Sequence, residues 1–187
     1  MLGLTPLQAH ALRRFAEQGF SATKLSHIAK DAGIKPPSVY AHFKSKEALF
    51  LSLLPPTVEH ELALTRERLA GHGRHETVLY DFLRDIGTRF SATHHMRFLV
   101  QAAFLPPPAL VRQVCARVDA FFAKQTDIIG RYFDAIPQGK LPPSTLTAAY
   151  QGIMDSLMTA LLFTGMDDFT VRLDALWAVF SLTLKEG

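Results

Sequence analysis

Two adjacent prolines, Pro36 and Pro37, stand directly before a stretch that has the spacing of a helix. Val39 and Phe43 lie four residues apart, so in a helix both side chains would point to the same side. Proline is well tolerated at the first helical position, because its missing N–H has no partner to lose there and its φ is already helical. We therefore predict that the prolines begin a short helix over residues 36–43. Free amides at this outward end are expected to favour phosphate.

A second short helix is predicted just before it, over residues 24–31. Thr23 is placed to cap this helix, and Leu25, Ile28, Ala29 and Ala32 would form its inward face. Gly33 can take the positive φ that a tight turn needs, and Ile34 would fill the corner. A short helix, a glycine turn and a second short helix with polar outward groups define the helix-turn-helix, whose second helix enters the major groove of DNA.

The rest of the chain is also predicted to be helical, because it lacks strand alternation and hairpin turns. Pro55 and Pro56 should kink or stop a helix, and Ser45 should cap the helix that opens after it. The expected fold is all-α, with a helix-turn-helix domain over residues 1–50 and a helical bundle over residues 51–187. The expected helices cover residues 6–18, 24–31, 36–43, 46–54, 57–70, 76–91, 94–105, 108–136, 144–164 and 168–185.

Positive charge is concentrated at the start of the chain. Residues 1–50 hold seven Lys and Arg against three Asp and Glu, a net charge of +4, whereas the remaining 137 residues have a net charge of −1. This asymmetry indicates an anionic partner for the first quarter, either nucleic acid or a membrane surface. The chain has one cysteine, Cys115, and we find no long apolar run or signal-peptide pattern, which favours a cytoplasmic protein.

The pattern TxxxxIAxxAGIxxxxVYxHFxSKExL, from Thr23 to Leu49, resembles the N-terminal domain of the TetR (tetracycline-repressor-like) family of transcriptional regulators. The resemblance covers about residues 5–54. It implies a homodimer that binds DNA and is released when a small molecule enters the C-terminal domain. By position it implies phosphate contacts from Thr23, Tyr40, His42 and Lys46, and places Lys35, Pro36, Pro37, Ser38 and Ala41 nearest the base edges. Pro37 departs from the glycine of many members, and Ala41 leaves only a methyl contact, which suits a thymine methyl.

The C-terminal helices are predicted to form a dimer. The helix over residues 144–164 is apolar nearly all round and must be covered on both sides. The last helix carries Val171, Ala175, Ala178 and Leu182 on one face and Phe169, Leu173, Leu176 and Phe180 on another. A four-helix interface, two helices from each chain, would cover the surplus apolar surface, although tight packing within one chain is the alternative. The expected interface residues are Ala148, Gly152, Ser156, Ala160, Ala175 and Ala178.

A pocket for an apolar or aromatic small molecule is expected in the C-terminal domain, since phenylalanine is abundant there and methionine adapts to varied shapes. By resemblance it would lie between the 94–136 helices and the 144–164 helix. Asp155 could pair across the dimer, bind a ligand cation or face water. The expected lining residues are Phe98, Phe104, Phe121, Phe122, Tyr150, Met154 and Met158.

Other classes of function fit less well. The histidines at 60, 72, 75, 94 and 95 lack ligand-like spacing with cysteine or carboxylates, so we expect no metal, no cofactor and no catalysis. A membrane-surface role would need a longer helix with bulky apolar residues on one face. The sequence therefore predicts a DNA-binding transcriptional regulator. A repressor is favoured over an activator, since repression needs only occupation of a promoter. The alternatives are an activator, or a helical ligand-binding protein without operator function.

Overall fold

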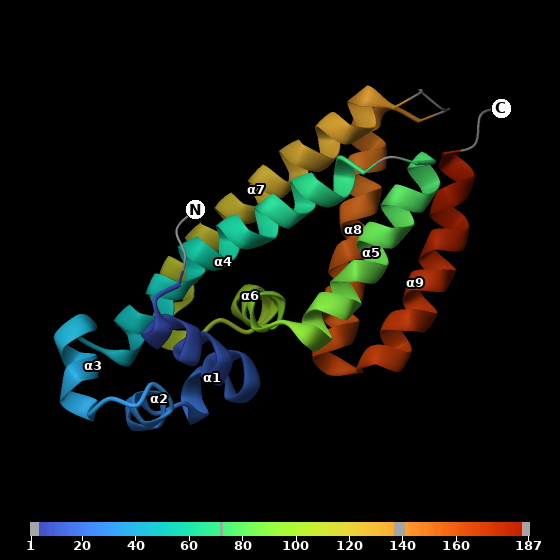
Figure 1. Cartoon of the computed structure of the whole chain (residues 1–187). Coiled ribbons are helices and arrows are strands. Elements are labelled where there is room, and N and C mark those ends of the chain that lie inside the picture. The colour runs from blue at the N-terminus through green and yellow to red at the C-terminus, as the bar shows by residue number, and fades with distance from the viewer. Residues whose placement is uncertain (1–3, 72, 137–140, 185–187) are drawn as a thin grey trace. The chain divides into compact units, whose positions relative to one another are not determined.

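The fold is all-α, as predicted. We describe a computed structural model of the chain, which covers residues 4–71, 73–136 and 141–184. Within those ranges the regular elements are helices, and Figure 1 shows them in chain order. None of the helices in the described part of the chain combines the length and the hydropathy that a membrane span requires.

The helix bounds agree with the predicted ranges except around prolines and glycines. The short 3-10 turns η1 and η2 replace the first turn of the predicted 108–136 helix and the last turn of the predicted 168–185 helix. The elements are α1 (Pro6–Ala22), α2 (Leu25–Asp31), α3 (Pro36–His42), α4 (Lys46–Leu69), α5 (His75–Ala92), α6 (His94–Phe104), η1 (Pro108–Leu110), α7 (Val111–Ala135), α8 (Pro143–Phe163), α9 (Met166–Phe180) and η2 (Ser181–Thr183).

The predicted helix ends at residues 54 and 57 are wrong, because α4 continues through Pro55 and Pro56, whereas the alternative of a kink at these prolines stays a prediction. Prolines at these positions leave the carbonyls of Leu51 and Ser52 without their usual i+4 donors. Gln8 on α1 supplies a substitute at one of them. Its Nε2 donates to the hydroxyl of Ser52 at 3.1 Å and lies 3.5 Å from the Ser52 carbonyl oxygen. A side chain from α1 thus provides hydrogen bonding at a point where the prolines remove a backbone donor of α4.

The structure divides into two compact units. The first contains the chain up to Glu61 and Thr93–Ala120, and the second contains Leu62–Ala92 and the chain from Phe121 onward. Each unit therefore takes part of α4 and part of α7. These two units are defined by packing alone. The predicted boundary between a DNA-binding domain over residues 1–50 and a helical bundle over residues 51–187 divides the chain by function, and it stays a prediction.

The first unit is built around α1, α4 and α6. Aromatic rings from three of its helices are in contact: the Phe50 centroid lies 5.2 Å from Phe15 and 4.9 Å from Phe98. The side-chain amide of Gln101 on α6 donates to the carbonyl of Ala16 on α1 at 3.0 Å. This core supports α2 and α3, which add the fully buried Ile28 and Val39.

The second unit is an arrangement of α5, α8 and α9 with parts of α4 and α7 (Figure 1). Its centre is Tyr150, a fully buried side chain whose hydroxyl donates to the carbonyl of Leu79 at 2.7 Å. The rings of Phe133 and Phe180 pack on it, with centroids 5.8 and 5.6 Å away. Tyr150 is therefore a core anchor with a satisfied polar end.

Candidate nucleic-acid interface

The turn between α2 and α3 has the geometry that the sequence predicts. Gly33 has a φ of +67°, in the left-handed region. The Gly33 N–H donates to the carbonyl of Lys30 at 3.1 Å, and the Ile34 N–H donates to the carbonyl of Ala29 at 3.0 Å. These two bonds form a Schellman motif, which closes the end of α2 and sets the direction in which the chain enters α3.

The expectation of free amides at the start of α3 is wrong for the first three positions. Pro36 and Pro37 have no N–H, and the N–H of Ser38 donates to the carbonyl of Lys35 at 2.9 Å. The prolines do begin the helix, as predicted, with Lys35 as the N-cap residue. This end of α3 is therefore poor in backbone donors, and any contact that it makes with DNA comes from side chains.

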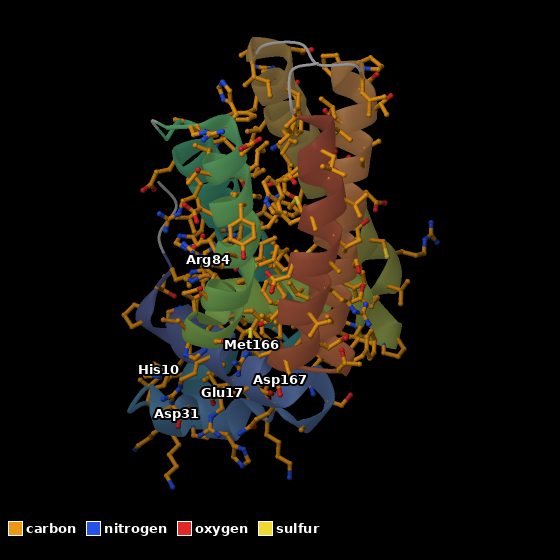
Figure 2. All side chains as sticks on the ribbon, turned by 90° about the vertical axis from the view of Figure 1, so that its right-hand side faces the viewer. His10, Glu17, Asp31, Arg84, Met166 and Asp167 are labelled. Atoms are coloured by element: carbon orange, nitrogen blue, oxygen red, sulfur yellow. The ribbon has the colours of Figure 1, made fainter. Side chains whose placement is uncertain are left out.

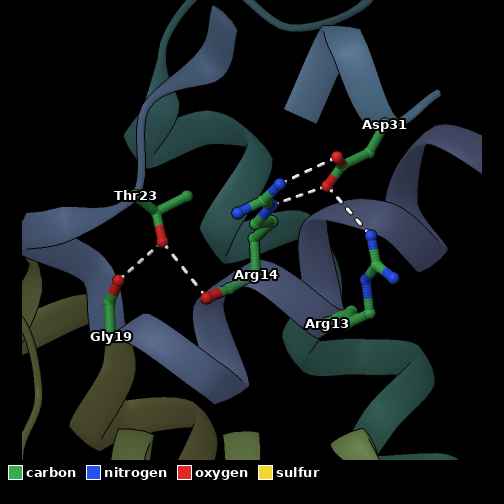
Figure 3. A network of polar contacts seen from close by, with 5 residues as sticks. All are labelled: Arg13, Arg14, Gly19, Thr23 and Asp31. Atoms are coloured by element: carbon green, nitrogen blue, oxygen red, sulfur yellow. Dashed lines mark hydrogen bonds and ion pairs between the residues drawn. The ribbon is translucent and has the colours of Figure 1, made fainter. Parts of the chain in front are cut away.

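A carboxylate from α2 binds two arginines from α1 (Figure 3). Arg14 donates to both oxygens of Asp31, with Nε–Oδ2 at 2.6 Å and Nη2–Oδ1 at 2.8 Å. Arg13 Nη2 donates to Oδ2 at 3.0 Å. The two bonds from Arg14, followed by the one from Arg13, hold the pKa of the Asp31 carboxyl well below its usual range. This bidentate network fixes α2 against α1, and it pairs the positive charges of both arginines with the carboxylate of Asp31.

Thr23 lies inside this framework. Its side chain is 1% exposed, and its hydroxyl contacts the carbonyl oxygens of Gly19 at 2.7 Å and Arg14 at 3.2 Å (Figure 3). The N-cap residue of α2 is Lys24, which forms no side-chain cap bond, so the prediction that Thr23 caps α2 is wrong. The hydroxyl of Thr23 instead serves the end of α1, where Gly19 interrupts the helix with a φ of +74°.

Lys46 begins α4 and also binds the end of α1. Its Nζ donates to the carbonyls of Phe20 at 2.8 Å and Thr23 at 3.1 Å, and lies 4.2 Å from the centroid of the Phe20 ring. An ammonium has three donor hydrogens, so one remains for a phosphate. Ser45 caps α4 as predicted, because its hydroxyl accepts from the Ala48 N–H at 3.1 Å.

Residues at the starts of α2 and α4 and on α3 border an open hollow of about 470 Å³. Three lysines and the exposed ring of Tyr40, which is 58% accessible, stand at its border. Hydroxyl and ammonium groups around an open concavity suit a phosphate oxygen. The lining residues are Thr23, Lys24, Leu25, Ser26, Pro36, Tyr40, Lys44, Ser45 and Lys46.

The predicted DNA-contacting residues fall into two groups. Thr23 and Lys46 are held inside the first unit by the bonds given above. The others are exposed along α3 and at its start: Lys35, Pro36, Pro37, Ser38, Tyr40, Ala41 and His42. Lys24 and Ser26 were not predicted, although both are exposed and line the hollow. For Ser26 the sequence held a signal, because it lies two residues before Ile28 and therefore points to the opposite side of the predicted 24–31 helix.

The predicted pocket residues are divided between the two units. Phe98 and Phe104 lie on α6 in the first unit, and Phe98 packs on Phe50. In the second unit, Phe121 is buried and its ring contacts that of Phe122 at a centroid distance of 5.3 Å. Tyr150, Met154 and Met158 are buried on α8. Pocket lining by these residues stays a prediction.

The predicted dimer residues lie on α8 and α9, and their exposure differs along α8. Ala148 and Gly152 are exposed, Ser156 is half-buried and Ala160 is fully buried within its own unit. Residues four apart are rotated by about 40° per step, since an α-helix has 3.6 residues per turn. Ala148, Gly152, Ser156 and Ala160 therefore follow a line that turns from the surface of α8 into the core, and the buried side chain of Ala160 is not part of an exposed face.

The two faces predicted for α9 differ in exposure as expected, except that Leu176 on the inner face is only half-buried. Phe169, Leu173 and Phe180 are buried. On the other side Val171 and Val179 are 66% and 69% exposed, and Ala175 and Ala178 are exposed as well. Further exposed apolar side chains are Phe163 at the end of α8, Met166 at the start of α9 (Figure 2) and Leu182 in η2. Asp155 is also exposed at the surface of α8. Its carboxyl loses part of its contact with water to the surrounding protein, which raises its pKa.

Two histidines of the first unit stack on each other. The rings of His60 on α4 and His95 on α6 stack with centroids 4.3 Å apart. Burial, with smaller effects of His60 and His94, lowers the pKa of His95 to about 4. The two rings make a packing contact, and the described residues contain no cluster of three or more His, Cys, Asp or Glu that could hold a metal ion.

The sequence pattern of the family described as "Bacterial regulatory proteins, tetR family" matches residues 8–53. Two regulators of Bacillus subtilis (strain 168) are similar over most of the chain. The uncharacterized HTH-type transcriptional regulator YerO is 28% identical over 83% of this chain and 54% of its own length. The uncharacterized HTH-type transcriptional regulator YdgC is 28% identical over 84% of this chain and 80% of its own length. The chain thus spans about half the length of YerO.

Solved structures share the fold across both units. The transcriptional regulator FadR of Bacillus subtilis, in complex with stearoyl-CoA, matches with a TM-score of 0.69 at 15% identity, covering 94% of this chain and 96% of FadR. NalD of Pseudomonas aeruginosa, the secondary repressor of the MexAB-OprM multidrug efflux pump, matches with a TM-score of 0.65 at 21% identity, covering 95% of this chain and 94% of NalD.

Proposed function

Because residues 8–53 make this chain a member of the tetR family of bacterial regulatory proteins, we propose that it is a DNA-binding transcriptional repressor. The observation that carries the proposal is the exposed surface of α3, with Lys35, Ser38, Ala41 and His42 outward and Val39 in the core. A short helix presented in this way by a glycine turn is the element that enters the major groove. The protein would act in the cytoplasm, where the chromosome lies, without catalysis.

Within this proposal, phosphate and base contacts come from different parts of the surface. Tyr40, Lys44 and Lys24 would hold the phosphate that occupies the hollow, with the remaining donor of Lys46. His42 would contact a neighbouring phosphate, and Thr23 would contribute through the end of α1 that its hydroxyl holds in place. Lys35, Pro36, Pro37, Ser38 and Ala41 would lie at the base edges. Phosphate contacts position the protein, and base contacts select the sequence.

A homodimer is the proposed assembly. The exposed apolar residues of α8 and α9, which include Val171 and Val179, would be covered by the same helices of a second chain. Ala148, Gly152, Ala175 and Ala178 would allow close approach there, with Ser156 at the edge. Two recognition helices would then contact a palindromic operator about one helical turn, roughly 34–36 Å, apart.

Release from the operator would follow binding of a small apolar or aromatic molecule in the C-terminal domain. FadR binds stearoyl-CoA, and NalD regulates a multidrug efflux pump. Long-chain acyl-CoA and aromatic drugs are therefore the first effectors to assay. An activator, or a ligand-binding protein without an operator, is the alternative, and the DNA-contact surface described above argues against the second.

The test is footprinting of the full chain on the DNA upstream of its own gene, with transcription from that DNA measured in the same reactions. We expect a protected palindrome that overlaps the promoter, and less transcript as protein is added. With eight to ten phosphates contacted, the slope of log K against log salt should be about −7 to −9. Protection with increased transcript would identify an activator. Absence of any preferred site in a random-duplex selection would overturn the proposal of DNA-based regulation.

A further inference from the structure

The direction in which each side chain of α3 points follows from the burial of Val39. Successive helical residues are rotated by about 100°, so Pro37 and Ala41 point most directly away from Val39. Ser38 lies on one side of them, and both Pro37 and Ala41 are exposed. Pro36 and Tyr40 are rotated toward the hollow, which they line. The outermost surface of the helix is therefore the ring of Pro37 and the methyl of Ala41, one turn apart.

This outermost surface carries almost no hydrogen-bonding capacity. Pro36 and Pro37 lack N–H groups, the Ser38 N–H is bonded to the Lys35 carbonyl, and the Ala41 side chain is a methyl. In the major groove, guanine and adenine are recognised by acceptors and donors, whereas thymine also presents an apolar 5-methyl group. An apolar surface pressed against guanine or cytosine edges would desolvate their polar groups without replacing the lost hydrogen bonds.

We propose that Pro37 and Ala41 form an apolar contact surface that selects thymine in each half-site through its 5-methyl group. The inference rests on the proposed operator binding and specifies its sequence preference. The charges nearby agree with this placement, because the exposed Lys24 and Lys44 line the hollow on the side of Tyr40, and the exposed Lys35 directly precedes α3. Bonds from these lysines to phosphates would hold the surface close to the duplex. Ser38 and Lys35, at the edge of the surface, would contact the neighbouring bases.

The experiment begins with duplexes that the full chain selects from a random library. Each thymine of the selected half-site is then replaced singly by deoxyuridine, which lacks only the 5-methyl group. One or two positions per half-site should bind about three- to fivefold more weakly, the effect of losing one buried methyl, and replacing both half-sites should square the loss. The remaining thymines should show no effect.

Variants connect the sensitive thymine to the protein. In Ala41→Gly, or in Pro37→Ala, the loss caused by deoxyuridine should shrink to less than twofold, because the thymine methyl then loses one of the two side chains that cover it. Lys44→Ala is the matched control: it should weaken binding to both duplexes equally and leave the deoxyuridine effect at its full size. These are differences between two duplexes bound by one variant, so a change in that variant's stability cancels.

The outcomes separate the two proposals. A selected duplex that tolerates deoxyuridine at every thymine would overturn the thymine inference and leave operator binding intact. A deoxyuridine effect of unchanged size in both Ala41→Gly and Pro37→Ala would overturn the assignment to these residues. Failure to select any duplex would overturn the proposed function itself, and the inference with it.

Discussion

Asp31 decides how firmly α2 is held, because its carboxylate receives three hydrogen bonds from Arg13 and Arg14 (Figure 3). These bonds lower the pKa of Asp31 in the folded chain below its value in the unfolded chain, which is near 4. Stability from the ionised carboxylate is therefore fully present above about pH 4 and is lost as the pH falls through the folded pKa.

We expect Asp31→Asn to lower the melting temperature at neutral pH, because the amide cannot accept both guanidinium groups as an anion does. The gap from the unsubstituted chain should narrow as the pH falls from about 4 toward the lowered pKa, since both chains then carry a neutral side chain. Asp119→Asn, an exposed residue of the same unit, is the control and should change little at any pH. Thermal unfolding followed by circular dichroism checks both, and a pH-independent gap would contradict the expectation.

Lys46 connects the start of α4 to the end of α1 through two carbonyl oxygens. Lys46→Met keeps the length of the side chain and removes the donors, so we expect the free energy of unfolding to fall by about 1.5–3 kcal/mol, the usual value of hydrogen bonds to a charged group. Lys44→Met, at an exposed position on the same hollow, should cost less than about 0.5 kcal/mol. Urea titration measures both. If the two variants unfold alike, Lys46 is not the connection that the geometry indicates.

At the scale of elements, α5 and α9 approach each other at Gly87. A Cβ built on this residue would lie 2.7 Å from Cε1 of Phe169, a buried ring that cannot move freely. Gly87→Ala should therefore push the helices apart and destabilise the second unit by about 1–3 kcal/mol, although alanine favours helices. Gly130→Ala is the control, since its Cβ would meet only the Thr147 hydroxyl at 3.7 Å and should stabilise α7. Equal stabilisation by both, in chemical denaturation, would contradict the close approach.

What the sequence predicted at the element scale depended on local chemistry. The positive φ of Gly33, the cap from Ser45 and the proline start of α3 follow from neighbouring residues alone, and all three were found. The continuity of α4 through its two prolines did not follow, and neither did the bond that Ser52 receives there from Gln8, which is more than 40 residues away. No periodicity could have indicated that partner.

The same limit applies to the candidate site. The exposed positions of α3 were predictable from helical spacing around Val39, but the inward turn of Thr23 and the carbonyl bonds of Lys46 were not. Both depend on where the interrupted end of α1 lies. A threonine or lysine that binds the backbone of another element cannot be told by its residue type from one that faces solvent. The packed structure is needed to distinguish the two cases.

At the scale of the whole molecule, dimerisation determines how many DNA phosphates one assembly can contact. A single α3 of seven residues reaches few of them, whereas two copies held together double the number. The exposed side chains of Val171 and Val179, both more than 60% accessible, provide the surface on which the proposed dimer depends. Covering them would also remove an exposed apolar patch.

Val179→Glu tests this dependence. Because Val179 is 69% exposed, the substitution should leave the fold of the single chain within about 0.5 kcal/mol. In a dimer it would bury two unpaired carboxylates, which costs several kcal/mol, so sedimentation velocity at micromolar concentration should show a monomer. The control is Ala123→Glu on the exposed side of α7, which should remain dimeric.

The monomeric variant should also bind the operator with about half the salt slope, since each bound chain then releases the counterions of one half-site. A Val179→Glu chain that stays dimeric and keeps the full slope would place the interface on another surface.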